Sequence, residues 1–100
     1  MTTQHLNIDY KSLPVAADDW KGPFQSTYLG GYVNKTKKNS YRFEDFNVAV
    51  EYANKIDKCK GITMIYLRNK KIYELRVGTN GIIPANPQKI YTALASWIKN

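Results

Sequence analysis

Alternation between apolar and polar side chains is clearest in the stretch from Cys59 to Gly78, CKGITMIYLRNKKIYELRVG. Residues 62–68 are mostly apolar, whereas residues 72–77 alternate apolar with charged side chains. Two such runs joined by a basic turn at residues 69–70 predict a β-hairpin. Because the first strand is apolar on both faces, we expect it to lie inside a sheet rather than at its edge.

The two faces of the second predicted strand differ in polarity. One face carries Tyr73, Leu75 and Val77, and we expect it to be buried. Glu74 and Arg76 are then expected to point outward, into solvent.

A single apolar stripe predicts a helix within residues 41–57, YRFEDFNVAVEYANKID. Glu44 and Asp45 are expected in its first turn, and Lys55 and Lys58 near its end, because these charges suit the helix dipole. An apolar stripe of this kind is typical of a helix that covers a sheet. The stripe consists of Phe46, Ala49, Val50, Ala53 and Ile56.

The remaining segments are assigned from turn residues and short apolar runs. Residues 1–19 are predicted to form a polar arm or a short edge strand, with Pro14 breaking any helix. Residues 26–33 are predicted to form a strand. Turns or loops are predicted at residues 20–24 (WKGPF), 34–40 (lysine-rich) and 79–87.

The C-terminal residues 88–99 fit either a helix or a strand. Asn86 as N-cap and Pro87 at the first helical position favour a helix. Residues 20–100 are therefore predicted to form one α+β domain. In it a small antiparallel sheet of three to five strands packs against one main helix, with a second C-terminal helix as a further possibility.

Residues 43–78 contain FEDFNVAVEYANKIDKCKGITMIY followed by IYELRVG. A helix that runs into a short cysteine-bearing turn and then a hairpin resembles the centre of PAN or apple-type domains. Those domains are usually pinned by disulfides, whereas this chain has the single cysteine Cys59 and can form none within itself. The resemblance implies a module that binds proteins or glycans rather than an enzyme.

Fifteen Lys or Arg against eight Asp or Glu give the chain a net charge of +7. Such a charge favours acidic partners, although it also serves solubility alone. No apolar run is long enough for a signal peptide or a transmembrane helix. With one cysteine and no such segment, the default expectation is a soluble, intracellular protein.

Few residues suit catalysis or metal binding. Cys59 would need a nearby base to act as a nucleophile, and His5 is the chain's one imidazole. Glu44 and Asp45 are explained by the helix dipole, and no phosphate-binding or dinucleotide motif is present. We therefore expect a protein that is not an enzyme and has no metal and no cofactor.

The remaining hypothesis is that the protein recognises a partner through its surface, because aromatic and basic residues together can bind proteins, sugar rings or nucleic acid. A protein or glycan partner is the first hypothesis, and nucleic acid or another polyanion the second. Self-assembly into a structural homo-oligomer is the third, since a small sheet leaves edges that can pair. For any single tyrosine, a half-buried position in a sheet is favoured over a binding role. The candidate ligand-binding residues are Trp20, Tyr28, Tyr32, Tyr41, Tyr66, Arg68 and Arg76, and the candidate anion contacts are Lys35, Lys37 and Lys38.

Overall fold

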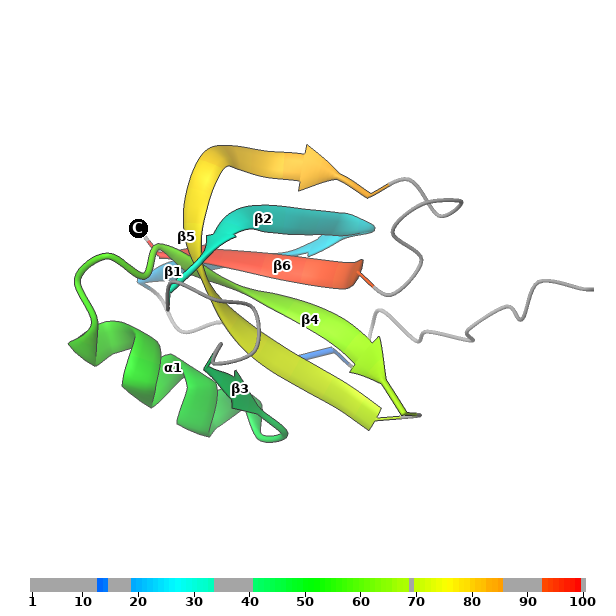
Figure 1. Ribbon diagram of the computed structural model, residues 1–100, viewed down its shortest axis with the longest axis horizontal. Coiled ribbons are helices and arrows are strands. Elements are labelled where there is room, and N and C mark those ends of the chain that lie inside the picture. Colours follow the sequence, from blue (N-terminus) through cyan, green and yellow to red (C-terminus); the bar gives the residue numbers. More distant parts are fainter. Residues whose placement is uncertain (1–12, 15–18, 34–40, 69, 86–92, 100) are drawn as a thin grey trace, which may run out of the picture.

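The computed structural model describes residues 13–14, 19–33, 41–68, 70–85 and 93–99. Within them the chain forms six strands and one helix (Figure 1). No helix among these residues is long and apolar enough to cross a membrane. The elements are β1 (Trp20–Gln25), β2 (Thr27–Tyr32), β3 (Arg42–Phe43), α1 (Phe46–Lys55), β4 (Gly61–Leu67), β5 (Lys70–Pro84) and β6 (Ala93–Lys99).

The strands form one antiparallel sheet in the order β1-β6-β4-β5-β2, and β3 pairs with β5 beside β2. The predicted hairpin is confirmed, since β4 and β5 pair from Gly61 with Arg76 to Leu67 with Lys70. The apolar strand β4 lies between β6 and β5, as its two apolar faces predict. The predicted α+β class holds, but the sheet has more strands than the three to five expected.

The C-terminal segment explains part of this difference, because residues 93–99 form β6 rather than the favoured helix. β6 lies between β1 and β4 and pairs with both, and these long-range pairings outweigh a local helix signal. The proposed cap residues Asn86 and Pro87 lie outside the described residues.

Residues 20–24 were expected to form a turn, but they belong to β1, which pairs with β6. Their turn-like sequence is accommodated by an irregularity in the pairing between Lys21 and Phe24. Gly22 has a φ of 127° there and precedes a cis peptide bond to Pro23. A strand can therefore contain the glycine and proline that suggested a turn, because the ladder is interrupted at that point.

β5 also extends further than expected, through most of the turn-rich stretch 79–87. It bends strongly in its middle (Figure 1). Positive φ values at Gly78 and Asn80, 84° and 64°, mark the bend. β2 follows the bent strand with two register shifts, so β2 reaches over the sheet toward β6.

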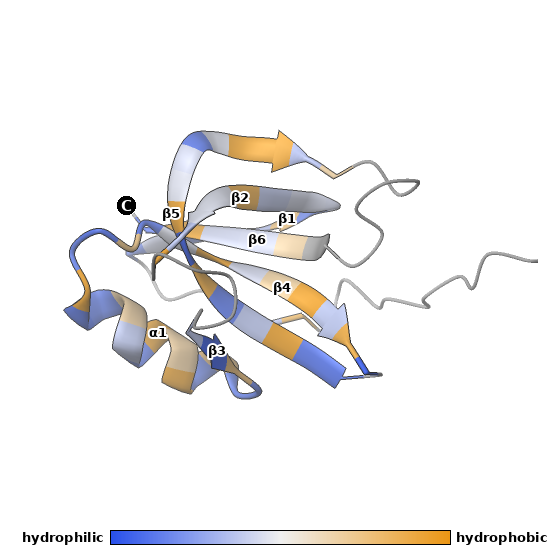
Figure 2. Ribbon diagram, in the orientation of Figure 1, coloured by the Kyte–Doolittle hydropathy of each residue, from blue (hydrophilic) through white to orange (hydrophobic). Residues whose placement is uncertain are grey.

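The helix packs on one face of this sheet. Phe46, Ala49 and Ala53 of the predicted stripe are buried, and Val50 and Ile56 are partly buried. Asp45 is the N-cap and accepts hydrogen bonds from two backbone amides, rather than lying in the first turn. Figure 2 shows that apolar and polar positions alternate around the helix. The sheet residues beneath it include Ile62, Met64, Tyr73, Leu75, Ala95 and Trp97.

An aromatic cluster joins helix and sheet. The ring of Phe46 lies 5.4 Å from that of Tyr73 and 4.8 Å from that of Trp97. Trp97 Nε1 also donates a hydrogen bond to the carbonyl of Pro14 at 2.9 Å. The prediction of a buried face is confirmed for Tyr73 and Leu75, while Val77 is partly buried.

Candidate functional site: a basic pocket beside a buried ion network

The face of the sheet opposite α1 carries a buried network of charged side chains. Glu74 is fully buried, and its Oε1 accepts a hydrogen bond from Arg76 Nε at 2.8 Å. Its other carboxylate oxygen, Oε2, accepts one from Arg42 Nε at 2.6 Å. Glu74 and Arg76 were expected to face solvent, and this is wrong.

The burial of this network follows from the position of β2, which covers it. Arg76 Nη1 donates to the carbonyl oxygen of Leu29 in β2 at 2.7 Å. The guanidinium of Arg76 also lies 4.7 Å from the ring centre of Tyr32. Paired, hydrogen-bonded charges of this kind can be buried where lone ones could not. The alternation of apolar and charged residues within β5 could not reveal that another strand, β2, lies over the face that carries Glu74 and Arg76.

The hydroxyl groups of Thr63 and Ser96 extend the buried polar network across β4 and β6. Thr63 pairs with Glu74 on one side and Ser96 on the other, and the two hydroxyl oxygens lie 3.1 Å apart. Thr63 Oγ1 accepts a hydrogen bond from the amide of Leu29 at 2.9 Å, and Ser96 Oγ donates one to the carbonyl of Thr27 at 3.0 Å. These hydrogen bonds therefore hold the backbone of β2 over the sheet.

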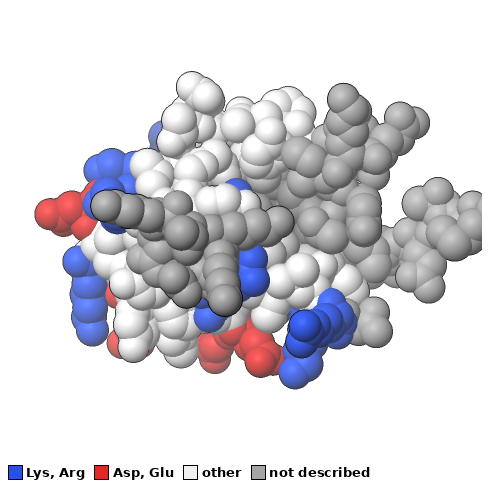
Figure 3. Space-filling view, viewed as in Figure 1, with Lys and Arg blue, Asp and Glu red and all other residues white. Residues whose placement is uncertain are grey.

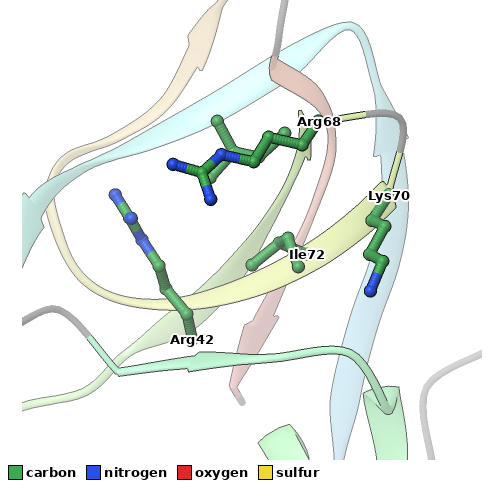
Figure 4. Close-up of a pocket in the computed structure, with 5 residues that line it drawn as sticks. Arg42, Arg68, Lys70 and Ile72 are labelled. Carbon is green, nitrogen blue, oxygen red and sulfur yellow. The ribbon is translucent and has the colours of Figure 1, made fainter.

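A pocket of about 520 Å³ opens beside this network (Figure 4). Arg42 and Arg68 extend toward one another across it, from β3 and from the end of β4. The ammonium of Lys70 points away from them and pairs with Glu44 at 3.7 Å. The described residues that line the pocket are Arg42, Leu67, Arg68, Lys70 and Ile72.

Local structure explains how Arg68 reaches this position. Leu67 pairs with Lys70, so Arg68 belongs to a two-residue connection between β4 and β5. Its φ of 49° is in the left-handed region, which short hairpin connections favour. Leu67 and Ile72 lie on the sheet face away from α1 and supply the apolar part of the lining.

Positive charge exceeds negative charge at this site. Glu74 is shared by Arg42 and Arg76, and among the described residues no carboxylate forms an ion pair with Arg68. On the face in Figure 3 the described Lys and Arg side chains lie in separate groups, some beside Asp or Glu. Among the described residues, the pocket brings two arginines together with one lysine.

The residues predicted to bind a ligand do not form one surface. Arg68 lines the pocket, but Trp20 is buried with 5% exposure, and its Nε1 donates to Asn54 Oδ1 at 3.3 Å. Tyr41 and Tyr66 pack against the hydrophobic core. Tyr28 and Tyr32 are half-buried in β2, and Arg76 is buried. The predicted anion contacts Lys35, Lys37 and Lys38 lie outside the described residues.

Sequence reasoning missed Arg42 and the apolar part of the pocket. Arg42 lies on β3, a strand of two residues, which is too short for any periodic signal. Leu67 and Ile72 were assigned to strands, but their sequence gave no sign that they border a hollow. A signal for the pocket lay in the basic turn itself, where Arg68 and Lys70 stand close together.

Cys59 has the properties of a packed side chain. It is fully buried, and its Sγ donates to the carbonyl of Gly61 at 3.2 Å. Burial raises the pKa of the thiol above its ordinary value, which lowers the thiolate fraction near neutral pH. In the described part of the chain, no group of three or more His, Cys, Asp or Glu residues could hold a metal ion.

Comparisons with known proteins found no match: no family model, no curated protein and no solved structure is significantly similar to this chain.

Proposed function

We propose that this protein is a non-enzymatic binding module that takes an anionic group of a protein or glycan partner into the basic pocket. The observation that carries the proposal is the approach of Arg42 and Arg68 to one another over the pocket (Figure 4). Two guanidinium groups repel each other unless an anion lies between them. Guanidinium groups bind carboxylates, sulfates and phosphates through paired hydrogen bonds.

The PAN-like pattern of residues 43–78 supports the same kind of function, because it implies a binding module. The pocket lies at the tip of the hairpin in that pattern, where Arg68 connects the two strands. Nucleic acid is the second candidate, since on the face in Figure 3 the described Lys and Arg side chains form separate groups rather than a track for successive phosphates.

Binding measurements with an acidic peptide and a sulfated oligosaccharide test this function by isothermal titration calorimetry. We expect at least one of them to bind, and Arg68→Ala to weaken binding about tenfold, or about 1.4 kcal/mol. Arg68 is exposed and forms no ion pair with a described residue, so its removal should leave the fold intact.

Lys58→Ala is the matched control, because Lys58 is also exposed but does not line the pocket. It removes the same charge and should change affinity less than about twofold, in line with the small effect of exposed charges. Equal losses in the two variants would mean that binding depends on net charge alone, and the pocket would then have no special role.

A further inference from the structure

We infer that the preferred anion is a phosphate monoester on an aromatic carrier, the chemistry of a phosphorylated tyrosine side chain in a protein partner. This inference rests on the proposed function and narrows its ligand. Three features of the pocket support it: the fixed position of Arg42, the excess of positive charge and the apolar lining.

Arg42 presents a fixed set of donors. Its Nε is held by Glu74 Oε2 at 2.6 Å, and Glu74 is in turn fixed by Arg76. This bond uses one edge of the guanidinium and leaves both Nη groups for a ligand in the pocket. Arg68 approaches from the opposite side on an exposed side chain that forms no ion pair with a described residue, so it can adjust to what Arg42 holds.

The charges favour a dianion. Arg42 and Arg76 share the single carboxylate of Glu74, and Arg68 forms no ion pair with a described carboxylate. About two positive charges therefore remain without a described counterion. A phosphate monoester carries about −1.5 to −2 at neutral pH and offers three terminal oxygens. A carboxylate carries one charge and two oxygens, which a single guanidinium can occupy.

The apolar lining and the size of the pocket indicate the carrier. Leu67 and Ile72 line the same pocket as Arg42 and Arg68 and offer aliphatic surface there. The pocket is half open to solvent, and its volume of about 520 Å³ exceeds what a phosphate alone fills. An aromatic ring can lie on the aliphatic side chains while its phosphate lies between Arg42 and Arg68.

Four small probes test the inference by titration into the full chain in phosphate-free buffer, followed by amide chemical shifts in NMR. They are phenyl phosphate, phenyl sulfate, benzoate and inorganic phosphate. We expect phenyl phosphate to bind at least tenfold more tightly than each of the other three. Shifts should centre on residues 67–72 and on Arg42.

Substitutions in the pocket test separately which residues bind the phosphate and which bind the aromatic ring. Arg68→Lys keeps the charge but loses the planar pair of donors, so it should weaken phenyl phosphate about tenfold. Ile72→Ala should reduce the advantage of phenyl phosphate over inorganic phosphate, while leaving inorganic phosphate within about twofold. Lys58→Ala should change neither affinity, and unchanged thermal unfolding of each variant shows that the fold is kept.

Each contrary outcome is informative. Equal binding of inorganic and phenyl phosphate would overturn the aromatic carrier. Equal binding of benzoate or phenyl sulfate would overturn the phosphate ester, with sulfated glycans as the better partner in the latter case, and would leave the proposed function standing. If no probe binds while an Arg68-dependent acidic peptide does, the inference fails alone. If neither probes nor partners bind through Arg68, the proposed function fails with it.

Discussion

Replacing Glu74 with Gln would leave the guanidinium of Arg76 buried without a full negative charge beside it. Arg76 is 9% exposed and Glu74 is fully buried, so neither group can recover water without opening the structure. The glutamine amide would also place a donor where the carboxylate accepts from Arg42 or Arg76. The change is small in volume, so its effect reports on charge and hydrogen bonding rather than on packing.

The expected cost is about 3 kcal/mol. Removing one partner of a buried ion pair typically costs about 3–5 kcal/mol. We place this case at the lower end, because the side chain of Arg42 is 33% exposed and can turn to water. A loss of this size is a large part of the roughly 5–15 kcal/mol by which domains are stable.

Urea unfolding followed by tryptophan fluorescence measures this effect, since Trp20 and Trp97 are both buried. With a slope of about 1.5 kcal/mol per molar, the midpoint should fall by about 2 M. Glu51→Gln is the control, because Glu51 is an exposed carboxylate on α1, and it should cost less than about 0.5 kcal/mol. A loss below about 1 kcal/mol for Glu74→Gln would refute the reasoning, because β2 would then be held without the ion network.

Three further predictions concern other polar and titratable groups. Thr63→Val should cost about 1–3 kcal/mol in urea unfolding, because the amide of Leu29 loses its acceptor inside the protein. Asp45→Ala should cost about 1 kcal/mol in thermal unfolding, because two amides at the start of α1 lose their cap. Burial raises the pKa of the Cys59 thiol above 9.0 and, with the nearby Asp45 charge, that of the Tyr73 phenol above 10.0. The unfolded chain loses these protons at lower pH than the folded one, so these two groups should leave the free energy of unfolding unchanged near neutral pH and lower it as the pH rises through the alkaline range in denaturation series.

Each of these has its own control. Thr79→Val, at an exposed position of β5, should hardly change the free energy of unfolding. A cost equal to that of Thr63→Val would contradict the role assigned to the hydrogen bond between the Thr63 hydroxyl and the Leu29 amide. Asp45→Asn should keep most of the cap. Cys59→Ala should weaken the alkaline decline; a decline of unchanged size would show that the thiol does not contribute to it.

The sequence by itself determined the local elements whose periodic patterns are long enough to be read. The hairpin of β4 and β5 and the buried stripe of α1 follow from neighbouring residues, because spacing along the chain decides which side chains share a face. Arg68 was assigned to the end of the first strand, whereas the structure places it in the connection that follows, one residue earlier than the predicted turn.

Only the tertiary structure decided the rest. β6 and β1 are strands because each finds its partner far away in the sequence, which no local pattern records. Glu74 and Arg76 are buried because β2 crosses their face, and they tolerate burial because they pair with each other and with backbone groups of β2. Arg42 and Arg68 line the same pocket because β3 pairs with β5 of the hairpin. Periodicity predicts which face a side chain occupies, whereas long-range pairing determines what lies against that face.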